Sequence, residues 1–293
     1  MKFRKYDIFQ NFRRKSLFEN ILHCFVSLIF TIVAFSYLYI LIWNLISSFK
    51  THGEIIMEPF ALPTVFHWEN YKDIFSVLRV GDSTFFHMIF NSLAFSVWGT
   101  FANLFVSAQF AYVAVKYKFP GSNIITPLIM VIMTLPLYGV GGGTYELYHK
   151  LGLIDSYGQL LVFGSVTHSV TLYFMAYFKN LSWSYAEAAM IDGANHFDIC
   201  YRVMMPHVKP LFGSFFLINW LSAWNDYSST MIYHPKLPNL AYGIYQFQAE
   251  MLYLARLDIL AAACVVATIP SLVLFGAFNK QLTESVSLGG LKG

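Results

Sequence analysis

Residues 184–206 read SYAEAAMIDGANHFDICYRVMMP, a helix-forming segment that stands between two long apolar stretches of the chain. Ser184 and Glu187 have the spacing of a capping box, in which a serine hydroxyl and a glutamate carboxylate accept from free N–H groups at a helix start. We therefore expect a short helix to begin at Ser184. Gly193 supplies a favourable stop, because glycine readily adopts the left-handed conformation that ends many helices.

The second half of this segment predicts another helix. Asn195 can cap it, and Pro206 ends it or turns the chain back, because proline lacks a backbone N–H. The predicted unit is thus a helix, a glycine turn and a helix, and it belongs to the polar stretch 179–209. Since apolar stretches flank it on both sides, we expect it at a membrane surface.

The composition of the whole chain supports a membrane protein. It is 57% hydrophobic, 18% aromatic and only 12% charged, whereas soluble proteins average about 25% charged residues. The net charge of +3 is too small to suggest a nucleic-acid partner. The three cysteines lie far apart without CxxC spacing and are expected to be packing residues.

Runs without Asp, Glu, Lys or Arg indicate where helices cross the membrane, because crossing about 30 Å of hydrocarbon takes about 20 largely apolar residues. Five such runs have at least 21 residues each: 20–49, 83–115, 119–145, 156–178 and 259–279. A sixth candidate, 210–233, is interrupted by Asp226. The prediction is an all-α membrane protein with six transmembrane helices, one of them irregular.

Positive charges predict the orientation. With a cytoplasmic N-terminus, 13 Lys and Arg residues fall inside and six outside, which places both termini in the cytoplasm. A signal peptide is the alternative for the basic N-terminus, but the uncharged run after it is far longer than the about 7 to 15 residues of such a segment. The expected parts are a cytoplasmic tail (1–20), a first transmembrane helix with an outer loop (21–82), a five-helix core (83–279, including 179–209) and a cytoplasmic tail (280–293).

The residues of the opening segment match a known pattern. They are Glu187-Ala188-Ala189, three residues, Gly193, nine residues, Val203, one residue and Met205-Pro206. This spacing resembles the EAA signature of binding-protein-dependent ABC importer permeases, which usually has Ile and Leu where this chain has Val203 and Met205. Both changes keep apolar bulk.

Further stretches resemble the carbohydrate-uptake, maltose-type branch of that family. They are EAAMIDGA at 187–194, Asn91-Ser92-Leu93 at the expected opening of the second helix, Ile154-Asp155-Ser156-Tyr157 before the fourth, and the closing Gly289-Gly290-Leu291-Lys292-Gly293. The similarity covers nearly the whole chain.

The resemblance implies a type I ABC importer permease fold in which residues 185–194 form a coupling helix that docks on a separate nucleotide-binding subunit. The residues expected to couple the chain to the ATPase are Glu187, Ala188, Ala189, Asp192, Gly193, Ala194 and Pro206. A plainer interpretation makes Glu187 only a cap and Gly193 only a helix stop. The two are compatible, because a capping glutamate can also dock.

The resemblance also implies the partners: a second permease, around which the first helix wraps, two nucleotide-binding ATPase subunits and an extracytoplasmic solute-binding protein, in a prokaryotic cell membrane. The chain has no GxxxxGK[ST] loop, so we expect ATP and Mg²⁺ to be used by the partner ATPase and no cofactor to be bound here. Without an HExxH motif or a nucleophile elbow, neither an enzyme nor a metal site is expected.

A secondary transporter driven by an ion gradient is the competing class. Such proteins commonly place ionisable groups in mid-membrane. Here Asp226 and Asp258 fall near the outer helix ends, which leaves His168 as the ionisable residue well inside a predicted span. A single histidine among apolar residues is more often a packing residue than a proton relay.

The fifth predicted helix carries an aromatic stripe beside a polar one. The candidate substrate-pathway residues are Asn219, Trp220, Ser222, Trp224, Asn225, Asp226 and Tyr227. Aromatic faces can cover the C–H side of a sugar while amides, carboxylates and hydroxyls bond its OH groups. The alternative is that Trp224 and Tyr227 belong to the interfacial aromatic belt. In the resembled family the partner permease often holds most substrate contacts, so this subunit is expected only to line the path.

The outer loop expected at 234–255 has polar and aromatic residues. By resemblance, Tyr242, Tyr245, Gln246 and Phe247 are candidates to face the binding protein. By default they belong to an ordinary surface loop.

Overall fold

The computed structural model describes residues 17–117, 119–134, 140–161, 168–254 and 256–290, and this part of the chain is mostly helical. The longer helices are α2 (Leu17–Ser47), α5 (Phe85–Leu93), α6 (Gly99–Lys116), α7 (Ser122–Thr134), α8 (Val140–Lys150), α9 (His168–Asn180), α10 (Ser184–Ile191), α13 (Lys209–Trp224), α15 (Leu240–Leu254) and α16 (Leu257–Gly290). Short elements connect them: α3 (His52–Met57), α4 (Glu69–Val77), the antiparallel strands β1 (Arg79–Val80) and β2 (Ser83–Thr84), η2 (Tyr157–Leu161), α11 (His196–Asp198), η3 (Ile199–Met204), α12 (Met205–His207) and α14 (Ser228–Tyr233). The predicted all-α architecture is confirmed in this helical content.

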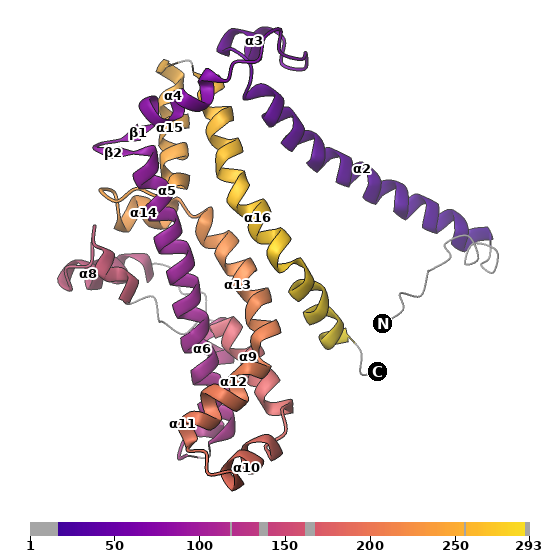
Figure 1. Ribbon diagram of the computed structural model, residues 1–293, viewed down its shortest axis with the longest axis vertical. Helices are drawn as coiled ribbons and strands as arrows, with labels where there is room; N and C mark the ends of the chain where they lie inside the picture. The colour runs from indigo at the N-terminus through magenta and orange to yellow at the C-terminus, as the bar shows by residue number, and fades with distance from the viewer. Residues whose placement is uncertain (1–16, 118, 135–139, 162–167, 255, 291–293) are drawn as a thin grey trace.

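Helices α5 and α6 are joined into one rod by a π-helical turn, η1 (Ala94–Trp98). A π turn carries one more residue than an α turn and often lies at a functional site. The rod runs along much of the long axis of the molecule, beside α13 in its lower part (Figure 1). It therefore connects the two ends of the fold.

Two hydrophobic cores hold the bundle, one near each end. The first joins α6 and α9 to the segment α10–α12, with Tyr112, Phe174 and Ile199 almost fully buried. The second joins α4, α5, α13, α15 and α16 and includes Phe85 and Trp220. The end with α3 is the expected outer end, and the end with α10 is the expected inner end (Figure 1).

Helix α2 diverges from the bundle along most of its length (Figure 1). It contacts α16 near its outer end, where the Asn44 side chain donates to the carbonyl of Ala261 at 3.5 Å. Most of its apolar side chains are exposed. In water such a surface would be unfavourable, so it needs lipid or a partner protein.

Three helices in the described part of the chain are long and apolar enough to cross a membrane: Phe18–Ser47, Phe85–Lys116 and Leu257–Asn279. The predicted spans 156–178 and 210–233 correspond to shorter helices, α9 and α13, the latter followed by α14. Residues 162–167 lie outside the described residues.

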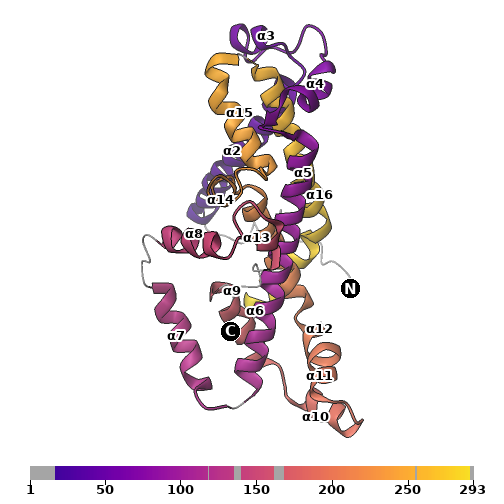
Figure 2. The same cartoon turned by 90° about the vertical axis from the view of Figure 1, so that its left-hand side faces the viewer.

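The predicted span within 119–145 is divided in the structure between two helices, α7 and α8, which run in different directions (Figure 2). Helix α7 ends at Thr134, and α8 begins at Val140 and runs across the long axis of the bundle (Figure 2). Pro136 follows the end of α7 in the sequence, and a proline disfavours helix at the residue before it and removes a helical donor. The absence of charged residues identified an apolar stretch here, but it did not predict the directions of the two helices within it.

Candidate functional site

Helix α10 begins at the first residue of the quoted segment, as predicted, but not through the predicted capping box. Ser184 is its first residue, and its N–H donates to Oγ of Ser182 at 3.2 Å. Glu187 is exposed and makes no capping hydrogen bond. The capping-box prediction was wrong because Ser182, two residues earlier, already satisfies the free N–H. Glu187 is thereby free of any capping role.

The end of α10 follows the prediction. Gly193 has a φ of +83°, in the left-handed region that favours glycine. Its N–H donates to the carbonyl of Met190 at 3.0 Å, and the N–H of Ala194 donates to that of Ala189 at 2.9 Å. This pair of bonds is a Schellman motif, which satisfies carbonyls that a helix end leaves unpaired.

The second helical stretch begins at the predicted cap but passes Pro206. Asn195 Oδ1 accepts from the N–H groups of Phe197 and Asp198, both at 2.9 Å. Helices α11, η3 and α12 then run together to His207. The π-helical hydrogen bonding of η3 precedes Pro206, where a regular α-helix would lack a donor and meet the proline ring. The chain turns at Val208 instead.

One side of this segment packs against the hydrophobic core at the expected inner end, and the other side is exposed. Ala186 and Ile199 are fully buried, whereas Ile191 is 87% and Phe197 72% exposed. The predicted coupling residues are placed accordingly: exposed are Glu187, Ala188, Asp192 and Gly193, and partly buried are Ala189, Ala194 and Pro206. Apolar side chains beside carboxylates at an exposed tip are typical of a surface that binds another protein.

Side chains from the end of α6 fasten this segment. Lys116 Nζ donates to the carbonyl of Leu181 at 2.5 Å, and the Tyr117 hydroxyl lies 3.1 Å from Nδ1 of His196. A third bond joins the Tyr177 hydroxyl of α9 to the carbonyl of His207 at 2.6 Å. These hydrogen bonds attach the segment to the inner ends of α6 and α9.

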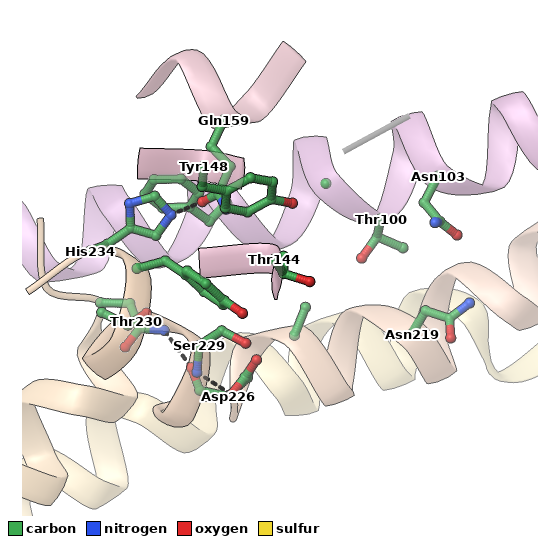
Figure 3. Close-up of a pocket in the computed structure, with 15 residues that line it drawn as sticks. Thr100, Asn103, Thr144, Tyr148, Gln159, Asn219, Asp226, Ser229, Thr230 and His234 are labelled. Carbon is green, nitrogen blue, oxygen red and sulfur yellow. Dashed lines mark hydrogen bonds between the residues drawn. The ribbon is translucent and has the colours of Figure 1, made fainter. Parts of the chain in front are cut away.

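A cavity of about 340 Å³ lies between the start of α6 and the end of α13, with walls from α8, η2 and α14. Its lining residues are Phe95, Gly99, Thr100, Asn103, Thr144, Tyr148, Gln159, Asn219, Ala223, Asp226, Ser229, Thr230, Tyr233, His234 and Asn239. Figure 3 shows Thr100 and Asn103 of one wall facing Asn219 and Asp226 of the other. The volume is at the lower end of the range of about 300–1,000 Å³ for ligand sites.

The aromatic stripe of α13 faces away from this cavity. Trp220 and Trp224 are 1% and 3% exposed and stack with ring centroids 5.1 Å apart. Trp224 Nε1 donates to the carbonyl of Ala267 on α16 at 3.1 Å. Trp220 is a core residue, whereas Trp224, although almost fully buried, lines a second cavity of about 390 Å³ together with Asn225 and Tyr227.

The polar stripe is divided. Asn219 and Asp226 line the cavity, while Ser222 and Asn225 are exposed elsewhere. The helix ends at Trp224, so the predicted helical register does not extend to Asp226. Tyr227 stacks on Tyr245 of α15, with ring centroids 4.4 Å apart.

The far wall of the cavity is held by hydrogen bonds between segments distant in sequence. Asn239 Nδ2 donates to the carbonyl of Asp226 at 2.8 Å, and Asp226 Oδ1 accepts from the N–H of Ser229 at 3.0 Å. Nε2 of His234 is bonded to Oε1 of Gln159. These bonds fix the polar end of the cavity.

Residues of the two short stretches that carried the branch resemblance support this wall. Asn91 lies in the second turn of α5 instead of opening it, and Tyr157 donates to its Oδ1 at 2.5 Å. Asn91 Nδ2 donates to the carbonyl of Pro238 at 2.9 Å. Asp155 Oδ1 accepts from the N–H of Lys236 at 2.7 Å. The connection between α14 and α15 is thus tied to α5 and to the residues before η2.

The predicted outer loop at 234–255 is largely the helix α15. Phe247 is 5% exposed and belongs to the outer core, and Tyr242 packs against that core. Tyr245 is 42% exposed and Gln246 is partly buried. A binding-protein contact through Phe247 is therefore wrong, because its side chain faces inward.

Several cavity residues were not among the sequence candidates. They are Thr100 and Asn103 on α6, Thr144 and Tyr148 on α8, and Gln159 and His234. Thr100 and Asn103 had a detectable signal, because they are polar residues three apart within a long apolar run. Within the described part of the chain, no group of three or more His, Cys, Asp or Glu side chains is placed to hold a metal ion.

Comparison with known families gives a match that includes the inner segment and the cavity walls from α8, α13 and α14. Residues 106–287 match the family described as "Binding-protein-dependent transport system inner membrane component". This range is more than half of the chain.

Two curated relatives cover most of the chain. One is the arabinooligosaccharides transport system permease protein AraQ of Bacillus subtilis, 29% identical over 92% of this chain and 95% of the relative. The other is the diacetylchitobiose uptake system permease protein NgcG of Streptomyces coelicolor, 27% identical over 85% of this chain and 82% of the relative.

The fold is shared with a chain of a solved bacterial ABC transporter involved in the import of the acidic polysaccharide alginate. The TM-score is 0.75 at 22% identity, and the alignment covers 91% of this chain and 98% of the other.

Proposed function

Because this chain belongs to the binding-protein-dependent transport system inner membrane component family, we propose that it is the transmembrane permease subunit of an ATP-driven importer of a sugar or oligosaccharide. The observation that carries the proposal is the bare, helix-glycine-helix tip at 184–207 inside the matched range. The permease names of two relatives with arabinooligosaccharides and diacetylchitobiose as cargo support the sugar.

The exposed tip is the ATPase-coupling site in this proposal. Ile191 and Phe197 supply apolar contact area, and Glu187 and Asp192 supply charge at its edge. Closure of two ATPase subunits on ATP moves the docked tip, and α6 and α9 move with it. ATP shifts the equilibrium between the inward-open and outward-open transporter only through its differential binding to the two states. The tip has to stay docked on the ATPase in both states, so that this bias reaches the permease.

The topology proposed is six spans with both termini in the cytoplasm, divided as tail 1–20, first helix and outer loop 21–82, core 83–279 and tail 280–293. The positive-inside count supports the orientation. The exposed surface of α2 supports its role in wrapping a second permease. Shorter helices α9 and α13 cross together with the segments beside them.

The remaining partners are two nucleotide-binding subunits, which use ATP and Mg²⁺, and an extracytoplasmic solute-binding protein. The chain has no phosphate-cradling loop of its own, so it is a transport component and needs no bound cofactor. Tyr245 and Gln246 at the outer end remain candidates to face the binding protein. The substrate passes beside Asn219 and Asp226 in the cavity.

The coupling site is tested by substitution in the complete transporter. Gly193→Asp puts a side chain on a φ of +83° and a charge at the dock; Glu187→Lys reverses a charge there. Both should leave membrane insertion intact and reduce ATP-driven uptake and ATPase association at least tenfold. Gly81→Asp is the control, because Gly81 has a φ of +55° and open space but lies at the opposite end. Normal uptake by both tip variants would refute the docking site.

Secondary transport is the competing function, and the energy source separates the two. Uptake into vesicles that contain ATP but have a collapsed ion gradient should continue for an importer of this family. Uptake that follows the gradient and ignores ATP would replace the proposal. Among the described residues, neither an acidic pair nor a lysine or arginine of the kind that couples ions lines the cavity.

A further inference from the structure

The cavity between α6 and α13 is lined by a negatively charged side chain and by no lysine or arginine among the described residues. The negative charge is that of the Asp226 carboxylate. Lys236, two residues beyond His234, is exposed and does not line the cavity. A negatively charged sugar would therefore meet a carboxylate without a compensating cation.

The histidine of the cavity is neutral in this geometry. Nε2 of His234 is bonded to Oε1 of Gln159, and an amide oxygen can only accept, so Nε2 carries the hydrogen. Nδ1 is buried and, among the described residues, has no hydrogen-bond partner. A second proton there would be unpaired, which is costly for a buried cation. His234 thus gives no positive charge to the cavity.

The inner end of the cavity offers neutral donors and acceptors. Nδ2 of Asn219 is buried and, in the described part of the chain, has no hydrogen-bond partner. An unsatisfied buried donor is uncommon in native proteins, and a ligand acceptor is one of the ways to satisfy it. Thr100 and Asn103 present a hydroxyl and an amide from the opposite wall (Figure 3). This is a set of groups that binds hydroxyls.

Aromatic rings complete the lining. Phe95, Tyr148 and Tyr233 form part of the wall beside the polar groups, and the Tyr148 and Tyr233 rings are 5.3 Å apart. Ring faces cover the C–H surface of a sugar, while the amides bond its hydroxyls. The similar proteins do not indicate whether the imported sugar is charged. Two relatives are named for arabinooligosaccharides and diacetylchitobiose, whereas the structurally similar transporter is involved in the import of an acidic polysaccharide.

We propose that this cavity is a binding subsite for an uncharged mono- or disaccharide unit and that it excludes sugars bearing carboxylate groups. Asn219 donates to a sugar hydroxyl, Asn103 and Thr100 bond the opposite edge, and Asp226 repels a uronate. The volume of about 340 Å³ limits the site to a short unit of a longer chain. The inference rests on the proposed import function, whose sugar cargo it narrows.

The test uses the full-length chain in lipid nanodiscs and a matched pair of probes, galactobiose and digalacturonate, which differ in the oxidation of C6. Saturation-transfer difference NMR detects weak binding of each. We expect a galactobiose signal at least tenfold stronger than that of digalacturonate. Equal signals, or no signal from either disaccharide, would overturn the subsite.

Two variants locate the binding. Asn219→Leu removes the unpaired amide and should reduce the galactobiose signal at least fivefold. Asn225→Leu, an exposed asparagine outside the cavity lining, is the matched control and should keep the signal. If both leucine variants behave alike, the cavity is not the binding site.

Asp226→Asn retains the Oδ1 acceptor for the Ser229 N–H and removes only the charge, so it guards against misfolding of the leucine variant. It should raise the digalacturonate signal at least fivefold. An unchanged digalacturonate signal would refute the role of Asp226 in exclusion. ATP-driven uptake by the complete transporter is measured separately: its absence would refute the proposed function, whereas uptake with equal NMR signals would refute only the subsite.

Discussion

At the scale of single residues, the carboxylate of Glu54 links two segments at the expected outer end of the fold. Its Oε2 accepts from the N–H of Thr51 at 2.9 Å, and its Oε1 accepts from the Thr64 hydroxyl at 2.5 Å. The first bond belongs to a capping box at the start of α3, and the second ties α3 to the chain ten residues later. The backbone bond from Thr51, followed by the Thr64 hydroxyl, lowers the pKa of Glu54 from 4.5 to about 2.

The depressed pKa of Glu54 gives a prediction about acid. Because the folded value lies below the unfolded one, the stabilisation is present above pH 4.5 and is lost as the pH falls toward 2. A carboxyl ¹³C titration should place the Glu54 midpoint near 2, and Thr64→Val should move it upward by removing a hydroxyl donor. A midpoint near 4.5 in both proteins would contradict the hydrogen-bond geometry.

At the scale of elements, the contact of α15 with α5 depends on a glycine. A Cβ added at Gly243 would lie 2.2 Å from Sδ of Met88, whose side chain is fully buried. Real Cβ atoms do not approach so closely, so the methionine or the helix would have to move. Gly276 of α16 has open space around its Cβ direction.

We predict that Gly243→Ala destabilises the protein by about 1–3 kcal/mol, as overpacked cores do. Gly276→Ala should be neutral or stabilising by about 0.5–1 kcal/mol through helix propensity. Adding Met88→Ala to Gly243→Ala removes the colliding atom, so the double variant should lose less stability than the two single variants summed. Reversible unfolding in detergent measures all four, and additive losses would exclude the close contact.

The elements also show what the sequence could predict. Uncharged runs located α2, the α5–α6 rod and α16, because a long apolar helix needs no tertiary information to be recognised. The direction of α8 depends on what it packs against, and absence of charge says nothing of that. For 234–255, the buried Leu240 and Phe247 recur at i and i+7, a helical signal that the polar and aromatic content obscured.

The candidate site was predicted in part. The tip at 184–207 has local signals, such as Asn195 and Gly193, that act within a few residues and were correctly interpreted. Asn219 and Asp226 were found because polar groups in an apolar helix stand out. The sequence could not show whether Trp220 and Trp224 point toward α16 or toward the substrate pathway, because tryptophan suits both a buried helix contact and a sugar pathway.

At the scale of the whole molecule, two helices connect the tip with the cavity. Helix α6 lines the cavity with Thr100 and Asn103 and holds the tip through Lys116, at its other end. Helix α13 starts just after the tip and ends at the cavity. Rigid helices with packed faces carry displacement over such distances when both ends have two discrete arrangements. In the proposed transporter we therefore expect a movement of the tip to reach the cavity walls through these two helices.

The link between Lys116 and the tip gives a prediction for the complete transporter. Lys116→Met with Tyr117→Phe removes the bonds to the carbonyl of Leu181 and to His196 while leaving the exposed dock unchanged. ATPase association should persist, but the amount of sugar taken up per ATP hydrolysed should fall about five- to tenfold, because the tip no longer carries α6 with it. Uptake and phosphate release in the same vesicles measure this ratio. Lys179→Met, which removes an exposed charge at the same end of the molecule, should leave the ratio intact, and an equal fall in both variants would show that charge at this end, and not the link to α6, governs coupling.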